Sequence, residues 1–380
     1  MNNIIGLYHE RRLLEKAILD NRLAGAYCFL GIEGVGKDAM AIEVAKVTNC
    51  YEPIITTEVD EQNNEYQSIA ACEHCKSCKM ANSLSHPNIQ FIYSIPGGDK
   101  LSDEQHSAIK EEIKLKVEDK YHKMVIPNAK YINIQQIRDI KKRASLSTVS
   151  YGRRFIIISN GEQMNTEAAN AFLKTLEEPQ PDTTIIITSS KKEQLLQTIL
   201  SRCQQIYFSP IPFDDMVTYL SSKHNKSNVE ARLIATFAQG SISNALNFFD
   251  DSINSMRSQA VDTLRSALHR KEYRIELTNA IDNILKSKDK KMFGLFLNLL
   301  LIWVRDVYSI AVLRNTELVI NLDLAERMVK FHNGYPDANL LNAISKIEQA
   351  IGRIERNVDP KMTFTALFIE LRRIFLQIDY

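Results

Sequence analysis

A glycine-rich turn that carries a lysine is the first stretch of this sequence whose residue types can do chemistry. Residues 22–30 run into a predicted strand, and Gly31, Gly34, Gly36 and Lys37 follow before a predicted helix. In a turn of this spacing, backbone N–H groups and the helix N-terminus bind phosphate, and the lysine reaches the terminal phosphates. The sequence therefore predicts a phosphate-binding loop for a nucleotide.

Two positions near this loop carry residues that do not suit ATP hydrolysis. Asp38 stands where a serine or threonine hydroxyl would bind Mg²⁺; its carboxylate could bind the metal directly but would also repel the phosphates. The buried strand that begins at Arg153 ends in Ser159 and Asn160, where a working ATPase has an acidic pair for the metal and the water. Neither side chain can accept a proton from water, and the spacing of Glu162 does not recommend it as a substitute. We expect ATP or ADP binding to be weak or absent.

Four cysteines near the loop have the spacing of a metal site. Three thiols lie close together and the fourth ends the preceding helix: Cys72, Cys75, Cys78 and Cys50. Four thiolates around Zn²⁺ form a closed tetrahedral site with a structural role. The alternative ligands are His74 and His86, and the alternative to a metal is a set of reduced thiols, since disulfides are rare in the cytosol. We predict a structural zinc site.

Strands and helices alternate in the region that follows. Apolar, β-branched runs and helices with one apolar face occupy residues 153–160, 165–176, 183–188, 194–200 and 205–208. This alternation is typical of a parallel sheet covered by helices on both faces. We therefore predict an α/β domain that carries the loop.

The same region resembles the AAA+ ATPase-type subunits of bacterial sliding-clamp loaders. The matching stretches are Asn-Ala-Phe-Leu-Lys-Thr-Leu-Glu-Glu-Pro at 170–179 and Ile-Leu-Ser-Arg-Cys at 199–203. In that family the arginine of Ser-Arg-Cys lies at a subunit edge and reaches the nucleotide of the neighbouring subunit. The resemblance therefore implies that Arg202 acts in trans. The alternative is a surface arginine at the C-terminus of a helix.

The resemblance extends from Ile4 to the lid of the family. It implies that the cysteines belong to a zinc module at about residues 50–86, in which residues 51–71 look like an insertion. Residues 240–246 resemble the lid motif, where an arginine would contact the γ-phosphate, but Ser243 occupies that position. The zinc module and Ser-Arg-Cys are kept while the ATPase positions are degraded. The resemblance is therefore greatest to the delta-prime branch of the family.

Two prolines after the last predicted strand, Pro210 and Pro212, mark the best domain boundary. We predict a RecA-like AAA+ domain with the zinc module, a small helical lid and an all-α domain, at residues 1–209, 210–250 and 251–380. The helical stripes of the last region predict a bundle. The resemblance implies that this bundle is a collar through which subunits assemble.

Composition limits the partners that the chain can have by itself. Its 380 residues are 24% charged and 44% hydrophobic, and the net charge is +1, so no overall charge drives it onto DNA or an anionic membrane. The longest apolar run, 292–304, is shorter than a membrane span and predicts a buried helix. No signal peptide is evident, so we predict a cytoplasmic protein. Residues 97–124 carry charges of mixed sign and predict a solvated helix or a mobile excursion.

The resemblance implies a clamp-loader subunit of DNA polymerase III that does not hydrolyse ATP and that supplies Arg202 to a neighbour. Its partners would be gamma/tau-like ATPase subunits and a delta-like subunit, with the sliding clamp and primer-template DNA reached through the complex. One alternative is a working gamma/tau-like ATPase, which Lys37 favours and Ser159-Asn160 opposes. Another is a zinc-containing nucleic-acid-binding module, which the near-neutral charge opposes.

Overall fold

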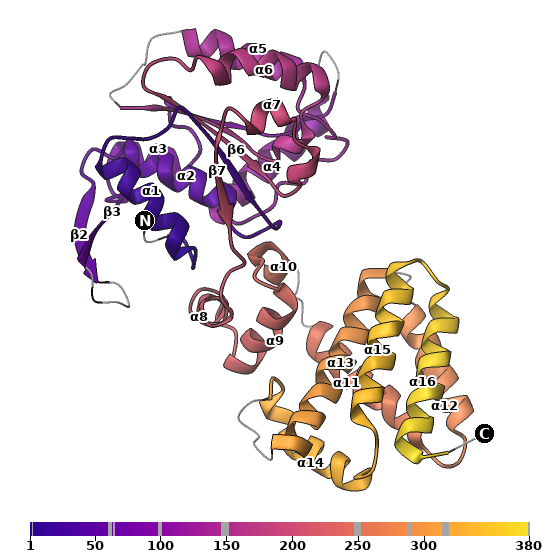
Figure 1. Ribbon diagram of the computed structural model, residues 1–380. Helices are drawn as coiled ribbons and strands as arrows, with labels where there is room; N and C mark the ends of the chain where they lie inside the picture. The colour runs from indigo at the N-terminus through magenta and orange to yellow at the C-terminus, as the bar shows by residue number, and fades with distance from the viewer. Residues whose placement is uncertain are drawn as a thin grey trace. The chain divides into compact units, whose positions relative to one another are not determined.

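The chain forms two compact units, which are described separately here (Figure 1). The first comprises Met1–Lys226 and Ala235–Leu246, and the second Ser227–Ile234 and Asn247–Tyr380. In this computed structural model the described residues are 1, 3–59, 63, 65–97, 101–145, 152–246, 252–286, 290–313 and 319–378.

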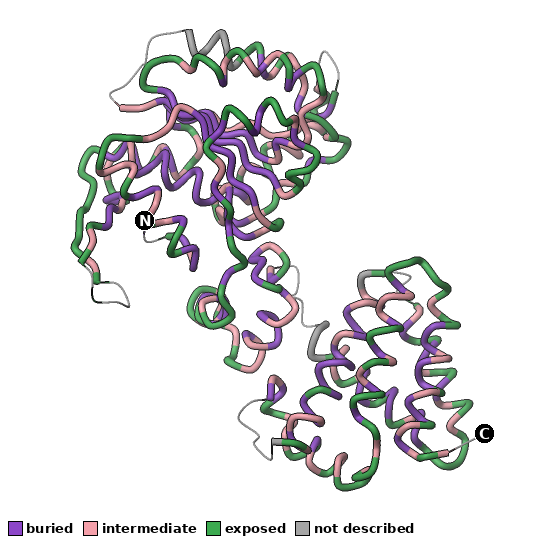
Figure 2. Tube along the Cα trace, viewed as in Figure 1, coloured by how far each residue is buried: buried purple, intermediate pink, exposed green. Residues whose placement is uncertain are grey.

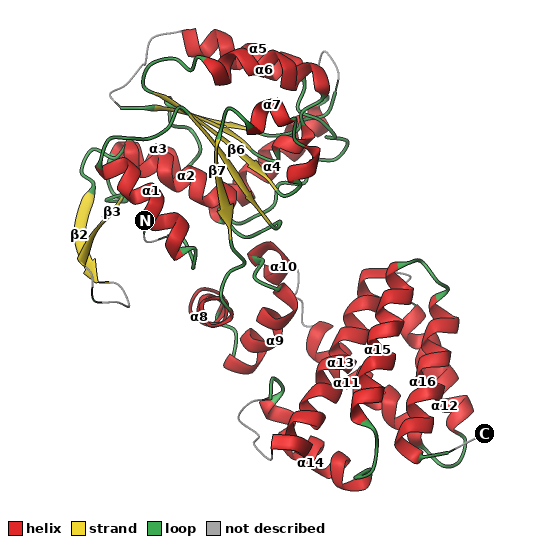
Figure 3. Cartoon of the chain, in the orientation of Figure 1, coloured by secondary structure: helices red, strands yellow, loops and turns green. Residues whose placement is uncertain are grey.

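A five-stranded parallel sheet forms the centre of the first unit (Figure 3). Its spatial order is β4 (Ile89–Ile92), β5 (Arg154–Ile158), β6 (Thr183–Ser189), β1 (Ala26–Gly31) and β7 (Gln204–Phe208). The inner strands are apolar and β-branched because both of their faces are buried. The predicted parallel sheet is confirmed, and the edge strand β4 was missed. All five strands end at the same edge of the sheet, and the glycine-rich loop follows β1 there.

Helices cover both faces of this sheet. Helices α5 (Ile134–Ser145), α6 (Thr166–Glu177) and α7 (Gln197–Leu200) pack on one face, where Phe172 and Ile199 join the buried core. Helices α1 (Tyr8–Leu19) and α2 (Lys37–Thr48) contact the strands from the other side. Figure 2 shows the sheet as the most continuously buried part of this unit. This rigid layer holds the loop and the strand ends together.

Two segments add no strand to the parallel sheet: one precedes β4 in the chain and the other follows it. They are called the first and second insertions. The first contains an antiparallel hairpin, β2 (Ile54–Val59) and β3 (Glu65–Ala70), followed by α3 (Lys76–Asn82). The second contains α4 (Asp103–Glu118). The prediction that residues 97–124 are solvated was wrong for the end of this segment, because Lys116 and Tyr121 are buried.

Three helices follow the last strand in the predicted lid region: α8 (Phe213–His224), α9 (Asn228–Ala238) and α10 (Ile242–Leu246). They fall within the small helical lid predicted at residues 210–250, of which residues 247–250 lie outside the described part of the chain. Gly240 has a positive φ of 78°, and a side chain there would collide with Pro210. This glycine therefore lets the chain pass close to the end of the sheet.

The second unit contains the predicted C-terminal helices: α11 (Ser252–Leu268), α12 (Tyr273–Leu285), α13 (Lys290–Leu313), α14 (Ala325–Gly334), α15 (Leu340–Glu355) and α16 (Pro360–Leu376). Helix α13 is central, packing against α11, α14 and α15, with Trp303 edge-on to Phe331. Its apolar part, Met292–Val312, is longer than predicted and is long and apolar enough to cross a membrane by length and composition alone. Most of it is buried against the neighbouring helices, which is typical of a core helix.

Candidate functional site

The predicted loop has the backbone that a phosphate-binding turn requires. Gly34 and Gly36 have positive φ values of 78° and 102°, which side chains rarely tolerate. Helix α2 begins at Lys37, with Gly36 as its N-cap. The structure therefore places the predicted glycines and Lys37 together at the end of β1.

Lys37 itself is folded back onto the loop. Its Nζ donates hydrogen bonds to the carbonyl oxygens of Gly31 (2.8 Å) and Ile32 (2.7 Å), and only 6% of the residue is exposed. Burial lowers the pKa of Lys37, which the nearby carboxylates of Asp38, Glu162 and Glu33 oppose. The ammonium group is thus satisfied by the chain's own carbonyls.

Asp38 accepts hydrogen bonds from both neighbouring strand ends. The hydroxyl of Ser159 donates to Oδ2 and that of Thr188 to Oδ1, each at 2.7 Å. The carboxylate therefore comes from the loop helix and the hydroxyls from the strands, which reverses the arrangement expected of a working ATPase. Glu162 does not replace the missing acid, because its carboxylate accepts from the backbone and hydroxyl of Ser190.

The end of the second insertion lies against this loop. Tyr121 packs so closely on Gly36 that a Cβ there would come within 2.6 Å of its ring. The ammonium of the buried Lys116 lies 3.7 Å from Oδ2 of Asp38. The space left at the loop is about 50 Å³, far below the roughly 300–1,000 Å³ of an ordinary small-molecule pocket. It has room for a few water molecules.

The residues after Gly240 close the loop from another side. The amide of Ile242 donates to the carbonyl of Gly34 (2.9 Å), and a Cβ on Gly34 would meet Ser241 and Ser243. Ser243, predicted to replace a phosphate-contacting arginine, does lie beside the loop. Its hydroxyl donates to the carbonyl of Tyr121 (3.0 Å).

Arg202 follows α7 and is only partly exposed, with 33% of its side chain accessible. Its Nη2 and Nε pair with the same carboxylate oxygen of Glu177, at 2.5 and 2.8 Å, and its Nη1 donates to the carbonyl of Thr198 (2.9 Å). The contact with Thr198 is that of an arginine at a helix C-terminus, the alternative considered above. The in-trans role therefore remains a prediction.

The four predicted cysteines form one cluster at the start of α3. Their sulfur atoms all lie within 4.8 Å of one another. The Sγ of Cys78 lies 3.5 Å from that of Cys50 and 3.9 Å from that of Cys72. Four thiolates at about 2.3 Å from a tetrahedral Zn²⁺ would be separated by roughly 3.8 Å, so the spacing fits such an ion. The cluster can therefore bind a metal.

Hydrogen bonds favour the thiolate form of one of these cysteines, whereas burial raises the pKa of the Cys50 and Cys78 thiols. Burial opposes ionisation of Cys75, but hydrogen bonds from the backbone of Cys78 and Tyr51 lower the pKa of its thiol to about 6. The backbone amide of Cys72 donates to the Sγ of Cys50 at 3.4 Å. Such N–H groups stabilise the thiolate form, which is the form that binds metals.

The two alternative histidine ligands are engaged elsewhere. The ring nitrogens of His74 contact the carbonyl of Cys72 and the carboxylate of Glu52. His86 is buried and its nitrogens contact the Ser77 hydroxyl and the Asn88 amide. The structure brings Cys50, rather than His86, to the other three thiols, although His74 and Glu52 form a second small group with Cys72.

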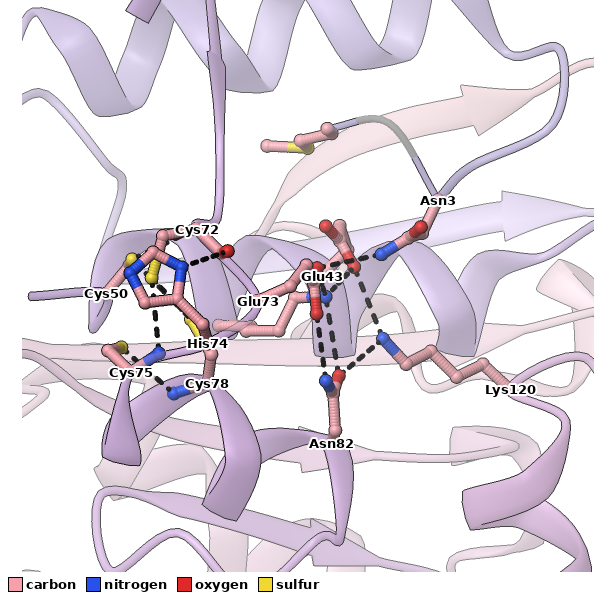
Figure 4. A network of polar contacts seen from close by, with 12 residues as sticks. Asn3, Glu43, Cys50, Cys72, Glu73, His74, Cys75, Cys78, Asn82 and Lys120 are labelled. Atoms are coloured by element: carbon pink, nitrogen blue, oxygen red, sulfur yellow. Dashed lines mark hydrogen bonds and ion pairs between the residues drawn. The ribbon is translucent and has the colours of Figure 1, made fainter. Parts of the chain in front are cut away.

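A buried ionic network connects the cysteine loop to the glycine-rich loop helix (Figure 4). Lys46 of α2 is fully buried and forms ion pairs with Glu43 of the same helix (2.8 Å) and with Glu73, which lies between the cysteines. Lys120 donates to Asn82 (2.9 Å), whose amide donates to Glu73 (2.9 Å). Sequence reasoning missed this network, because an alternation of charges in a helix normally indicates a solvated face.

Known proteins resemble this chain over much of its length. The family described as DNA polymerase III, delta subunit, matches residues 9–212. The DNA polymerase III subunit delta' of Bacillus subtilis (strain 168) is 26% identical over 349 residues, which cover 92% of this chain and 91% of the relative. Subunit tau of the same organism is 24% identical over 257 residues, covering 66% of this chain and 37% of the relative.

A solved structure adds a distant likeness. It is a DNA polymerase III gamma subunit-related protein from Thermotoga maritima, 17% identical, with 95% of this chain and 99% of that chain covered and a TM-score of 0.36. The family match is the stronger finding, because it spans more than half of the chain and includes the loop, the cysteines and Arg202. The chain therefore belongs to the DNA polymerase III delta subunit family and resembles its delta' subunits.

Proposed function

We propose that this chain is a delta'-type subunit of the DNA polymerase III clamp loader, which does not hydrolyse ATP itself and supplies Arg202 to an adjacent ATPase subunit. One observation carries the first part: in the described structure the ends of β5 and β6 present the hydroxyls of Ser159 and Thr188, which donate to Asp38, where a carboxylate would be needed to activate water. The small space at the loop supports weak or absent binding of ATP and ADP.

Arg202 supports the second part of the proposal. It stands after α7 with its guanidinium held by Glu177 and still partly exposed. A planar guanidinium can make a two-pronged contact with a phosphate, which stabilises the charge that develops during phosphoryl transfer. In this proposal Arg202 leaves Glu177 when a neighbouring nucleotide is presented to it.

The partners follow from the same proposal. The chain would join gamma/tau-like ATPase subunits and a delta-like subunit in a hetero-oligomer in the cytoplasm, with the C-terminal helices as the collar. The sliding clamp and primer-template DNA would be reached through the complex, since a net charge of +1 gives the chain no strong attraction of its own for DNA. Within the AAA+ architecture, α8–α10 would be the lid.

The cysteine cluster is proposed to hold one structural Zn²⁺. The ligands would be Cys50, Cys72, Cys75 and Cys78, whose spacing fits a tetrahedral ion. When bound, the ion cross-links residues that are distant in sequence in a module with little apolar core. The chain's own contribution is to orient the thiols through backbone N–H groups, as Cys75 and Cys78 do.

A working ATPase of gamma/tau type is the second candidate. The positive φ values of Gly34 and Gly36 favour it, because they keep a loop backbone able to receive phosphate. The similarity to a tau subunit over two thirds of the chain also supports it.

Measuring phosphate release by the isolated chain separates these two candidates. We expect no turnover above the background with Mg²⁺-ATP, and we expect Lys37→Ala to make no difference. We also expect the chain to form a complex when mixed with ATPase and delta-like subunits of a DNA polymerase III clamp loader. Steady turnover that Lys37→Ala abolishes would instead support the working ATPase.

Removing one proposed ligand should release the metal. We expect wild-type protein purified without chelator to contain one zinc per chain. Cys50→Ser should weaken zinc binding by more than the roughly 10–100-fold that follows the loss of an outer-shell partner. Elemental analysis after dialysis against a weak chelator measures this.

His74→Ala is the matched control for this experiment, because His74 is exposed and lies beside the cluster. It should leave the zinc content unchanged. Loss of zinc in His74→Ala together with its retention in Cys50→Ser would show that the fourth ligand had been assigned wrongly.

A further inference from the structure

The segment 116–124 occupies the place beside the loop where a nucleotide would be expected. It connects the end of α4 to the rest of the chain, and it lies against Gly36 and Asp38. Its sequence gives no sign of a role at the loop, because its mixed charges predicted a solvated helix or a mobile excursion. Three kinds of contact nevertheless fit it to the loop.

The first contact is the ring of Tyr121, which joins three parts of the unit. The ring packs on Gly36, and its centroid lies 6.1 Å from that of Tyr219 in α8. The Tyr121 hydroxyl accepts a hydrogen bond from the amide of Ile5 (3.0 Å), and its carbonyl accepts one from Ser243 of α10 (3.0 Å). Through its buried ring and its backbone carbonyl, this one residue therefore links the loop, α8 and α10, the elements between which a nucleotide would lie.

The second kind of contact is ionic. The Lys116 ammonium lies 3.7 Å from Asp38 and donates to the carbonyl of His122 (2.8 Å). Lys123 forms an ion pair with Glu33 of the loop. The charge of the loop carboxylates is thus balanced by cations of the same chain, and no Mg²⁺ is needed to balance it.

The third kind of contact holds the segment in its own shape. The Asp119 carboxylate accepts from the amide of Tyr121 (2.9 Å). The Glu112 carboxylate of α4 contacts the His122 ring (2.9 Å) and accepts from the amide of Val125 (2.8 Å). Lys120 enters the buried network beside the cysteine loop (Figure 4). The segment is therefore a folded element and its position is set from several directions.

We propose that residues 116–124 are a built-in occupant of the phosphate site, which holds α8 and α10 against the loop without any nucleotide. This proposal rests on the proposed function and extends it, because it supplies a reason why the subunit would not respond to ATP. A nucleotide could enter only after Tyr121 and Lys116 had left, and both would then lose their buried partners. The arrangement of the loop and these helices is consequently the same with and without ATP.

Hydrogen exchange and nucleotide binding on the full chain test this proposal. In the wild type, millimolar Mg²⁺-ADP should not change amide exchange at residues 31–38, and a fluorescent ADP should not bind. Tyr121→Ala should speed exchange at residues 241–246 by about tenfold or more, because the segment whose carbonyl accepts from Ser243 loses the ring that packs on Gly36. The control Tyr131→Ala, at a tyrosine that is 60% exposed, should leave that exchange unchanged.

The outcomes separate this proposal from the proposed function. Wild-type binding of ADP at the loop, with protection of residues 31–38 that Lys37→Ala removes, would overturn the built-in occupant even if no ATP were hydrolysed. Unchanged exchange at residues 241–246 in a folded Tyr121→Ala protein would overturn it as well. If Tyr121→Ala does not fold, the wild-type ADP experiment alone decides. Loss of the in-trans role of Arg202 would leave these measurements unaffected.

Discussion

Replacing Arg202 with alanine is expected to lower the ATPase turnover of a reconstituted clamp loader by roughly 10³-fold or more at the site that this arginine reaches. The chain should fold and assemble normally, because the contacts of Arg202 with Glu177 and Thr198 lie at a helix end and not in the apolar core. Turnover should fall more than nucleotide affinity, since the arginine stabilises charge mainly in the transition state. Phosphate release and nucleotide binding by the mutant complex measure the two effects.

Three further variants make this prediction specific. Arg202→Lys should restore only part of the turnover, because a point charge cannot make a two-pronged phosphate contact. Glu177→Gln should retain turnover, since it frees the guanidinium from its partner in this chain. Arg22→Ala is a control at an exposed arginine of the same unit. Equal turnover in the Arg202→Ala and Arg22→Ala complexes would show that Arg202 does not act in trans and is only a surface arginine at the C-terminus of a helix.

Lys46→Met is expected to destabilise the first unit by about 3–5 kcal/mol, which is the usual cost of removing one partner from a buried ion pair. Lys46 is fully buried, and its loss leaves the Glu43 carboxylate buried with only Lys120, 3.4 Å away, to balance it. Glu73 would lose a partner too, so the cysteine loop should become more mobile. Urea unfolding measures the free energy, and hydrogen exchange at residues 72–78 measures the loop.

A control and a double variant test the cause of this loss. Lys79→Met removes an exposed lysine from the neighbouring α3 and should change the stability by less than about 0.5 kcal/mol. Adding Glu43→Leu to Lys46→Met should recover much of the stability, because it removes the uncompensated carboxylate. A Lys46→Met protein as stable as Lys79→Met would mean that water solvates Lys46 in solution.

Local patterns predicted the parts of the site that consist of neighbouring residues. The spacing of Gly34, Gly36 and Lys37 predicted the loop because a tight turn constrains residues a few positions apart. Cys72, Cys75 and Cys78 predicted their own cluster for the same reason. The central strands were predictable because they are buried on both faces and therefore apolar throughout.

Long-range contacts accounted for what the sequence did not reveal. Strand β4 has only four residues, lies at the sheet edge and is partly exposed, so its pattern is weak. Lys116 and Tyr121 lie in a charged stretch and become buried only because the loop folds against them. Thr188 looked like one more residue of a buried strand, and its role as a donor to Asp38 depends on the parallel register that places it beside the loop.

The β2–β3 hairpin lies in the sequence interval between Cys50 and Cys72 and allows that interval to have other lengths. The strands pair from Ile54 with Ala70 to Val59 with Glu65, so both ends of the insertion leave the hairpin at adjacent positions. If each strand were shortened or lengthened by two residues, every side chain would stay on the same face of the hairpin. The Ile54–Ala70 end, where the chain enters and leaves the hairpin, would not change. A hairpin of another length would therefore still bring Cys50 and Cys72 together, and a fixed spacing between these two cysteines would be a poor criterion for finding such a cluster in other chains.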